Sequence, residues 1–521
     1  MDVRVQKNEF ARLALPDDLG LERLQKEWSL DIQPQESKTL IFWDSFEWGV
    51  WFGGYALYSC GERYHLSVRQ AGWSEPALCE EQTKGRPRFW QDFETGPLRT
   101  ALQELLGLRG LTPVAEGIFR QRRCDLRNDL EKVVCRLVLT SVSSAGKRGE
   151  KELLQSCQVL SLRGYESEAA RVVECLTECG ARGCEDAPLD VLLRYTHTLP
   201  QKYTLRPAFG LDMTTPARKA TGRIVRTMLE LAVSNLPGIL NDLDTEFLHD
   251  YRICLRKMRS VLSLVKGVYP AEETQRMRQL LGDLARQTNR LRDLDVYLLA
   301  REEYLGLLPQ ELRPALNGMF TDFTAERGKE VRRTTSKIRS PSIRCLLKEI
   351  EHCFCENTLH RASPAAELPV GPLVFSGIYK RYRKICKIAA QIDTETPDEG
   401  VHQLRIECKK LRYLMEFFGE MIPHEDGAAL QKVLRRLQGR LGEFNDASVQ
   451  QKSLLDYWKE KKPGSAVSLG LGGLISVLYQ RQQQTRALIQ QSLEEFCNGS
   501  TAAIFKRTFK LPASAPATDA P

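Results

Sequence analysis

Alternating hydrophobic and polar residues predict short β-strands in the first 200 residues of the chain. Glycine turns such as Gly53-Gly54 and Gly61 separate these runs. In the same region, Leu98–Leu106 and Glu166–Cys179 have hydrophobic residues at helical spacing. We therefore predict an α+β domain over residues 1–206. Its strands are expected at Thr39–Trp43, Tyr55–Ser59, His65–Arg69, Glu116–Arg120 and Val133–Ser141.

The hydrophobic pattern changes after residues 207–216, a segment with proline and glycine that we interpret as a linker. Over residues 217–510, hydrophobic residues recur every three or four positions, which indicates long amphipathic helices. Residues 511–521 are rich in alanine, proline and serine and predict a disordered tail. The C-terminal part is therefore predicted to be an all-α domain.

An internal repeat divides the predicted helical domain into two copies, around residues 217–355 and 370–510. His249–Arg259 matches His402–Arg412 at an offset of 153 residues. The match continues without a gap over 48 aligned positions, of which 11 are identical. The gapless register and the shared basic pattern indicate that a half-domain was duplicated.

The repeated helix carries a stripe of positive charge beside its hydrophobic face. At 100° per residue, the histidine and three cations of the first copy span an arc of about 80°. The stripe of the first copy consists of His249, Arg252, Arg256 and Arg259, with Lys257 on the other side of the histidine. The stripe of the second copy consists of His402, Arg405, Lys409 and Arg412, with Lys410 on the other side.

Such a stripe destabilises its helix, because like charges on adjacent turns repel each other. A bound anion would neutralise the stripe and remove this cost. Arginine binds two phosphate oxygens at once, lysine acts as a mobile charge, and histidine donates a hydrogen bond. One basic helix is typical of a solvated surface, but the repeated spacing favours an anion site. We expect no metal at the histidines, because neither copy has a Cys, Asp or Glu suitably placed beside the histidine and the surrounding cations would repel a metal ion.

Further basic residues are expected near the two stripes, where they could also bind the anion. For each of them, a solvated surface position without a ligand is an equally good interpretation. They are Arg223, Arg226, Arg339, Lys380, Arg383, Lys384, Lys387, Arg436 and Arg440.

Composition and charge agree with an anionic partner for the helical domain. The chain has a net charge of +8, but Arg218–Lys510 carries +12 and the remainder −4. A hydrophobic content of 42% with 27% charged residues favours a globular protein, and no run is long enough to span a membrane. Without a recognisable signal sequence, the protein is expected to be cytoplasmic, with its 15 cysteines reduced.

The repeated motif in His249–Arg259 and His402–Arg412, followed by Arg292–Val296, resembles that of the CHAD family, the conserved histidine α-helical domain. The resemblance covers Ala217 to about Lys510. It implies two four-helix bundles related by pseudo-two-fold symmetry, which bind inorganic polyphosphate along a basic central channel through the stripe residues. Asn445 stands opposite Arg292, where an arginine is usual, so we expect a smaller contribution from that corner.

The N-terminal region resembles more loosely the CYTH family, a β-tunnel that hydrolyses triphosphates with a bound divalent metal. The similar segments are Phe42–Trp48, Gly54–Leu57 and Gln201–Tyr203. The resemblance implies a β-tunnel or barrel, but Asp2–Lys7 retains at most one of the carboxylates that would bind the metal, and Tyr58 replaces an arginine. We therefore predict a degenerate tunnel without catalytic residues, metal or other cofactor.

The sequence thus predicts a non-enzymatic protein that binds inorganic polyphosphate and associates with polyphosphate granules. A divergent metal-dependent triphosphatase or polyphosphatase is the first alternative. Non-specific nucleic-acid binding is the second, which is disfavoured because the stripes lack interleaved aromatic residues. The glycine-rich segment Ser468–Gly473 is interpreted as a site of close helix packing rather than a phosphate-binding loop. Neither a membrane nor a particular protein partner is predicted.

Overall fold

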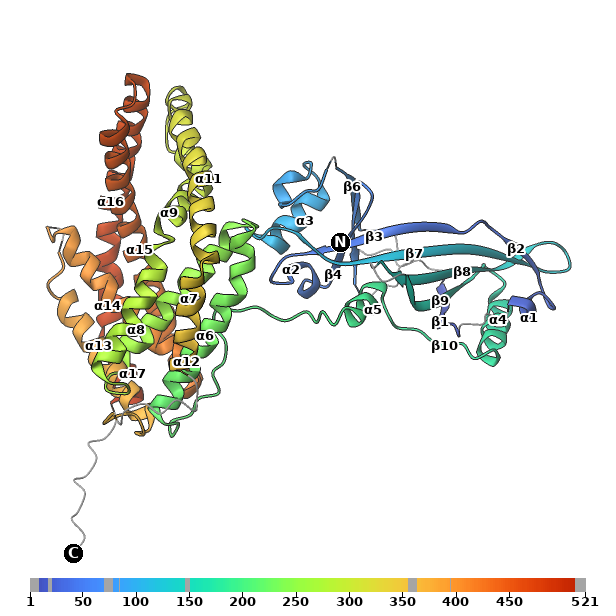
Figure 1. Cartoon of the computed structure of the whole chain (residues 1–521), viewed down its shortest axis with the longest axis horizontal. Helices are drawn as coiled ribbons and strands as arrows, with labels where there is room; N and C mark the ends of the chain where they lie inside the picture. Colours follow the sequence, from blue (N-terminus) through green and yellow to red (C-terminus); the bar gives the residue numbers. More distant parts are fainter. Residues whose placement is uncertain are drawn as a thin grey trace, which may run out of the picture. The chain divides into compact units, whose positions relative to one another are not determined.

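The computed structural model describes residues 9–16, 21–69, 78–83, 85–145, 150–354, 363–393 and 395–510. The chain forms two compact units, Met1–Tyr203 and Thr204–Pro521 (Figure 1). The first unit combines strands and helices and the second is helical, which confirms both predicted fold classes. The predicted tail lies outside the described residues. None of the described helices is both long and apolar enough to cross a membrane.

An antiparallel sheet of ten strands forms the frame of the first unit. The strand order is β10-β1-β9-β8-β7-β3-β4-β5-β6, with β2 paired to β7. Among the described strands the path does not return from β6 to β10, so the sheet is open where a tunnel or barrel was expected. The strands are β1 (Glu9–Ala14), β2 (Ser29–Ile32), β3 (Glu36–Asp44), β4 (Tyr55–Cys60), β5 (Arg63–Val68), β6 (Cys79–Gln82), β7 (Thr112–Arg127), β8 (Val133–Ser144), β9 (Lys151–Ser161) and β10 (Arg182–Gly183).

Amphipathic helices cover parts of this sheet with their apolar stripes. Val172 and Leu176 of α4 join a core with the central strands, and Leu98 and Leu102 of α3 join a second core. Leu192 of α5 belongs to a third. The helices of this unit are α1 (Leu21–Leu24), α2 (Gly49–Phe52), α3 (Pro97–Leu106), α4 (Glu166–Glu178) and α5 (Pro188–Tyr195).

Two sets of four helices form the frame of the second unit (Figure 1). The first set contains α6 (Ala217–Leu240), α7 (Thr245–Leu264), α8 (Ala271–Arg286) and α12 (Pro341–Cys353). The second set contains α13 (Val370–Ala389), α14 (Asp398–Phe417), α15 (His424–Lys461) and α17 (Gly499–Phe509). The two sets meet where α7 packs against α14. These contacts agree with the expected pair of four-helix bundles.

Reciprocal backbone hydrogen bonds show the pseudo-two-fold relation between the two copies. The amide of Ala217 donates to the carbonyl of Leu368 at 2.9 Å. At an offset of 153 residues, the amide of Val370 donates to the carbonyl of Thr215, also at 2.9 Å. Equivalent residues therefore exchange donor and acceptor roles, as they do across a two-fold axis between two subunits.

Four further helices extend the second unit beyond the two bundles: α9 (Asn289–Leu299), α10 (Arg301–Gly306), α11 (Asn317–Arg339) and α16 (Ser465–Cys497). Tyr297, Phe323 and Leu474 belong to the apolar core that holds them together. A Cβ atom on Gly470 would lie 3.2 Å from the Cβ of Ala315. This close approach confirms that the glycine-rich segment in α16 serves helix packing.

Close packing also predicts the effect of a substitution at the junction of α6 and α7. A Cβ atom on Gly238 would lie 2.2 Å from Cγ of Phe247, which is buried, so Gly238→Ala must displace the ring. We expect this change to lower the free energy of unfolding by about 1–3 kcal/mol, measured by urea titration. Gly377→Ala in α13 is the control, because a Cβ there meets no atom within 4 Å. That variant should be at least as stable as the wild type, and equal effects of the two changes would contradict the packing argument.

Candidate anion-binding site

The repeated helices α7 and α14 are placed so that their basic stripes approach each other. Asp244 begins α7, since its Oδ1 accepts hydrogen bonds from the amides of Glu246 at 2.9 Å and Phe247 at 3.2 Å. The apolar faces of both helices are buried, as Leu255 and Leu411 show. Because α7 and α14 pack together, the cations beside these faces are brought to one seam.

Four cations form a cluster at this seam, which we call the seam cluster: Arg256, Arg405, Lys409 and Arg412. The charge of Arg256 on α7 acts on both Arg405 and Lys409 on α14. The two copies of the repeat therefore contribute to one site. All four belong to the predicted stripes.

Lys409 shows the electrostatic cost of this arrangement most clearly. Its burial, followed by repulsion from Arg405, Arg256 and Arg412, lowers the pKa of its ammonium group to about 8. Asp446 opposes the shift without cancelling it. A bound anion would restore the usual preference for the charged form.

Counter-charges are sparse at the seam cluster. The nearest Asp446 oxygen is 3.7 Å from Nη2 of Arg405, which is longer than a good charge-assisted hydrogen bond. The Nε atoms of Arg405 and Arg412 are buried, and neither has a hydrogen-bond partner among the described residues. Such donors favour a ligand that supplies acceptor oxygens.

A second group of arginines lies on α7 and α8, and we call it the α8 cluster: Arg259, Arg278 and Arg286. Burial and the charges of Arg278 and Arg286 lower the pKa of Arg259. A Cβ atom on Gly282 would lie 3.5 Å from Cζ of Arg259, so the small glycine leaves room for the guanidinium. Arg278 and Arg286 were not among the residues predicted from the sequence, although an angular plot of the α8 sequence would have raised them as candidates.

Arg252 is fixed by the backbone and side chains at the junction of α8 and α9. Its Nη1 donates to the carbonyl of Ala285, to Oγ1 of Thr288 and to Oδ1 of Asn289, each at 2.8 Å. Nη1 carries two hydrogens, so two of the three acceptors share one of them, and the other guanidinium nitrogens are not used in these bonds. Arg252 therefore both joins two helices and extends the basic stripe of α7.

The two histidines have different partners. Nδ1 of His402 lies 2.7 Å from Oδ1 of Asn445. An amide oxygen only accepts, so in this orientation the ring donates from Nδ1, and the other ring nitrogen remains for a ligand. Asn445, which stands opposite Arg292 in the repeat, thus orients the second histidine.

The first histidine belongs to an acidic group on one turn of α7. Ligand-type atoms of Glu246, His249 and Asp250 all lie within 4.8 Å of one another, so these residues could hold a divalent ion. The sequence-based expectation that no acidic side chain is suitably placed beside a histidine is therefore wrong for the first copy. Nη1 of Arg292 lies 4.0 Å from Glu246 and balances part of this negative charge. In the second copy Gln403 replaces Asp250.

Lys257 departs from the predicted exposed stripe. Its side chain is 5% exposed and forms an ion pair with Glu416 of α14, while its Nζ also donates to the carbonyl of Leu205 at 2.6 Å. Burial lowers the pKa of Lys257, and Glu416 opposes this shift. Lys257 therefore serves the contact between the two copies.

Its counterpart Lys410 is also engaged, in a group around the buried Glu407. Nζ of Lys410 lies 2.9 Å and Nζ of Lys384 lies 3.1 Å from Oε1 of Glu407, and Arg381 donates to the other oxygen. Burial would raise the pKa of Glu407, but hydrogen bonds from Lys410 and Arg381 outweigh it and lower the pKa to about 2. Lys384 and Lys410 thus neutralise a buried carboxylate.

The other predicted basic residues are dispersed. Arg223 donates from Nη1 to the carbonyls of Phe209 at 3.0 Å and Gly210 at 2.7 Å. Arg226 is half-buried on α6, and Arg339 lines a separate pocket. Arg436 pairs with Glu495 and Arg440 with Glu443. Lys380, Arg383 and Lys387 are exposed on α13.

A pocket of about 370 Å³ lies on the sheet of the first unit. Among the described residues that line it, Glu152 is the one carboxylate, and it lies with Arg120 and Arg122. Arg122 donates to Oε1 of Gln35 at 3.0 Å. The described lining does not supply paired carboxylates for a divalent metal. The segment Asp2–Lys7, on which the sequence argument rested, lies outside the described residues.

The lowered pKa of Lys409 predicts how stability depends on pH. An unfolded lysine has a pKa near 10.4, so below about pH 8 the folded state bears the full cost of burying the charged ammonium group and of its repulsion by the neighbouring cations. We expect Lys409→Met to be more stable than the wild type at pH 7, by roughly 1–2 kcal/mol after solvent screening. The advantage should shrink between about pH 8 and pH 10, because wild-type Lys409 then loses its proton first in the folded state.

Urea unfolding across this pH range measures the difference between Lys409→Met and the wild type. Lys432→Met is the matched control, since Lys432 is exposed on α15. Its effect should stay small at every pH. A stability difference for Lys409→Met that does not change with pH would contradict the electrostatic interpretation.

Comparison with known proteins shows what the helical unit is similar to. Residues 223–455 match the family model of the CHAD domain. A comparison with curated proteins gives no match. Several solved structures are similar over part of the chain. The CHAD domain from the plant Ricinus communis is 21% identical, with a TM-score of 0.48 over 56% of this chain and 95% of that chain.

PptA from Streptomyces chartreusis is 17% identical, with a TM-score of 0.41 over 54% of this chain and 100% of that chain. HpAC1 from Hippeastrum, a protein reported to have a dominant triphosphatase activity, is 15% identical, with a TM-score of 0.24 over 36% of this chain and 95% of that chain. The family model matches residues 223–455, which is less than half of the 521 residues, and over that segment the helical unit is similar to the CHAD domain.

Proposed function

We propose that this protein binds inorganic polyphosphate at the seam cluster without hydrolysing it. The observation that carries the proposal is the meeting of Arg256 with Arg405, Lys409 and Arg412 across the contact of α7 and α14. Four cations share one site, and burial together with repulsion from its basic neighbours lowers the pKa of Lys409, a shift that Asp446 opposes only in part. An anion with several phosphate groups supplies the missing charge and the acceptor oxygens.

The arrangement of the two arginine groups favours a polymer over a single phosphate. Arg256 in the seam cluster and Arg259 in the α8 cluster are three residues apart on α7, so they lie on neighbouring turns. The two clusters therefore adjoin along the helix. A chain with negative charge on every repeating unit can contact both clusters at once, and the contacts then reinforce one another.

The site residues differ from those the sequence suggested. In our proposal the direct contacts come from the seam cluster, the α8 cluster, Arg252 and His402. Lys257, Lys384 and Lys410 stabilise the fold through Glu416 and Glu407 instead. We propose that binding at this site also localises the protein to polyphosphate granules.

Buried aromatic residues support polyphosphate over nucleic acid as the ligand. Tyr251 on α7 is 1% exposed and Tyr413 on α14 is 5% exposed, so neither offers a face for base stacking. Polyphosphate and nucleic acid can both contact the cations through phosphate groups. Only nucleic acid would gain affinity from base stacking on exposed aromatic rings, and this site offers no such ring on Tyr251 or Tyr413. We therefore propose that the site prefers polyphosphate over DNA.

Binding of long-chain polyphosphate to the full chain tests the proposal. The double variant Arg256→Ala/Lys409→Ala should bind at least tenfold more weakly, because two phosphate contacts are removed. Over a series of salt concentrations, the slope of log affinity against log salt should fall by about one for each lost contact. Isothermal titration calorimetry gives both quantities.

The control for this experiment is Lys459→Ala, which removes one exposed cation near the end of α15. It should change the affinity little. DNA with a matched number of phosphates is the competitor. Equal affinity for DNA, or binding that the double variant leaves intact, would overturn the proposal and indicate general attraction between opposite charges.

The proposed absence of hydrolysis has its own test. The sheet pocket has one described carboxylate, Glu152, in its lining, beside two arginines. We therefore expect no release of phosphate from tripolyphosphate or long-chain polyphosphate with Mg²⁺ or Mn²⁺. Glu152→Gln is the informative variant, because phosphate release by the wild type that this change abolishes would show that the first unit is a divergent triphosphatase.

A further inference from the structure

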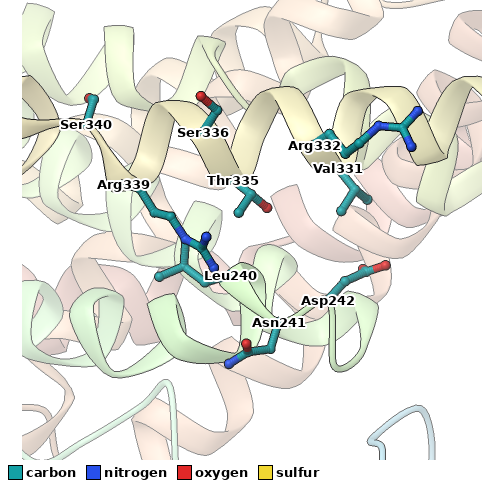
Figure 2. A pocket seen from close by; sticks show the side chains of 9 residues that line it. All are labelled: Leu240, Asn241, Asp242, Val331, Arg332, Thr335, Ser336, Arg339 and Ser340. Carbon is teal, nitrogen blue, oxygen red and sulfur yellow. The ribbon is translucent and has the colours of Figure 1, made fainter.

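A pocket of about 550 Å³ lies outside the seam cluster, between the C-terminal end of α6 and α11 (Figure 2). On one side, α11 contributes Arg332, Thr335, Ser336 and Arg339. On the other side, the turn after α6 contributes Asn241 and Asp242. The volume is in the range of small-molecule sites. No residue of the seam cluster lines this pocket.

The α11 side presents a regular polar face. Its four polar residues occupy positions i, i+3, i+4 and i+7, which lie on one side of a helix. The two arginines at its ends are separated by about 10 Å along the helix axis, with two hydroxyl groups between them. Among the described residues, neither Arg332 nor Arg339 forms a salt bridge. In Figure 2 the side chain of Arg339 extends from α11 toward the turn after α6, whereas that of Arg332 runs along α11. Both side chains are exposed, so Arg332 reaches a ligand in the pocket after a change of rotamer.

The opposite side is polar and fixed in place. Arg327 donates to both carboxylate oxygens of Asp242, at 2.9 and 2.8 Å, and its Nε donates to Asp295 at 2.7 Å. Asp295 is buried, so this network anchors the Asp242 carboxylate at the pocket. In Figure 2, Asp242 and Arg339 lie toward different ends of the pocket.

We propose that this pocket binds a small phosphorylated polyhydroxy compound, such as a sugar phosphate. The arginines would bind the phosphate groups, and Thr335 and Ser336 would add hydrogen bonds. Asp242 and Asn241 would bind sugar hydroxyl groups, because a carboxylate accepts hydrogen bonds from hydroxyls and an amide both donates and accepts.

The fixed carboxylate of Asp242 distinguishes this ligand from a bare oligophosphate. Arg327 already neutralises this carboxylate, so its remaining lone pairs favour a ligand that donates hydrogen bonds. Sugar hydroxyl groups can donate to it, whereas an ionised oligophosphate has no hydrogen to donate. The pocket therefore selects for a compound that carries both kinds of group. This inference is independent of polyphosphate binding at the seam cluster.

Calorimetric titration of the full chain with fructose 1,6-bisphosphate tests the proposal. The variant Arg256→Ala/Lys409→Ala serves as the background, so that the seam cluster does not contribute. In this background we expect binding that weakens at least tenfold when Arg332→Ala and Arg339→Ala are added, because both phosphate contacts are lost. Arg333→Ala is the matched control on α11, since Arg333 pairs with Glu330 and does not line the pocket.

Two comparison ligands test the chemical class. Pyrophosphate has two phosphate groups without hydroxyls, and fructose has hydroxyls without phosphate. Both should bind at least tenfold more weakly than fructose 1,6-bisphosphate. The proposal is overturned by equal affinity for pyrophosphate, by absence of binding at millimolar concentration, or by binding that Arg333→Ala weakens as much as the pocket variants do.

Discussion

The rest of the helical unit depends on the contact between α7 and α14. This contact joins the two copies of the repeat and brings cations from both copies close together. Burial of Leu255, Met258 and Leu411, all 0% exposed, stabilises the packing of α7 and α14 in the helical unit by about 1.5–3 kcal/mol for each side chain. Repulsion between like charges on helix surfaces is smaller, at about 0.2–0.5 kcal/mol for each pair. Apolar burial therefore holds the seam cluster together, and the uncompensated charge remains available for a ligand.

The helical unit uses its cations in two physically distinct ways. Lys257 and Lys410 neutralise Glu416 and Glu407, whose side chains are 15% and 1% exposed. Removing either partner would leave a buried charge without compensation, so these lysines belong to the fold. Within the part of the chain that the structure describes, neither Lys409 nor Arg256 forms an ion pair with a carboxylate, and Asp446 only partly offsets the shift in the pKa of Lys409. Cations of the first kind stabilise the contact between α7 and α14. Cations of the second kind destabilise this contact until an anion binds to them.

The sequence predicted the strands with alternating patterns well but missed others. Thr39–Trp43 lies within β3 and Val133–Ser141 lies within β8, because one face of each strand is apolar. Lys151–Ser161, which forms β9, lacks a regular alternation and was not predicted. Its neighbours β1 and β8 supply the backbone partners that make it a strand. Whether the sheet closes into a barrel likewise depends on which distant segments pair with each other. Local hydrophobic patterns do not determine this pairing.

By itself, the sequence determined the two fold classes, the duplication and the basic stripes, because helical periodicity and repeated spacing are local properties of the chain. It placed Arg256, Arg405, Lys409 and Arg412 among the candidates. Only the tertiary structure decided which cations share a site, since Glu416 lies 159 residues from Lys257 in the chain and still neutralises it. Charge pairing depends on distances between side chains, and packing of remote helices sets those distances.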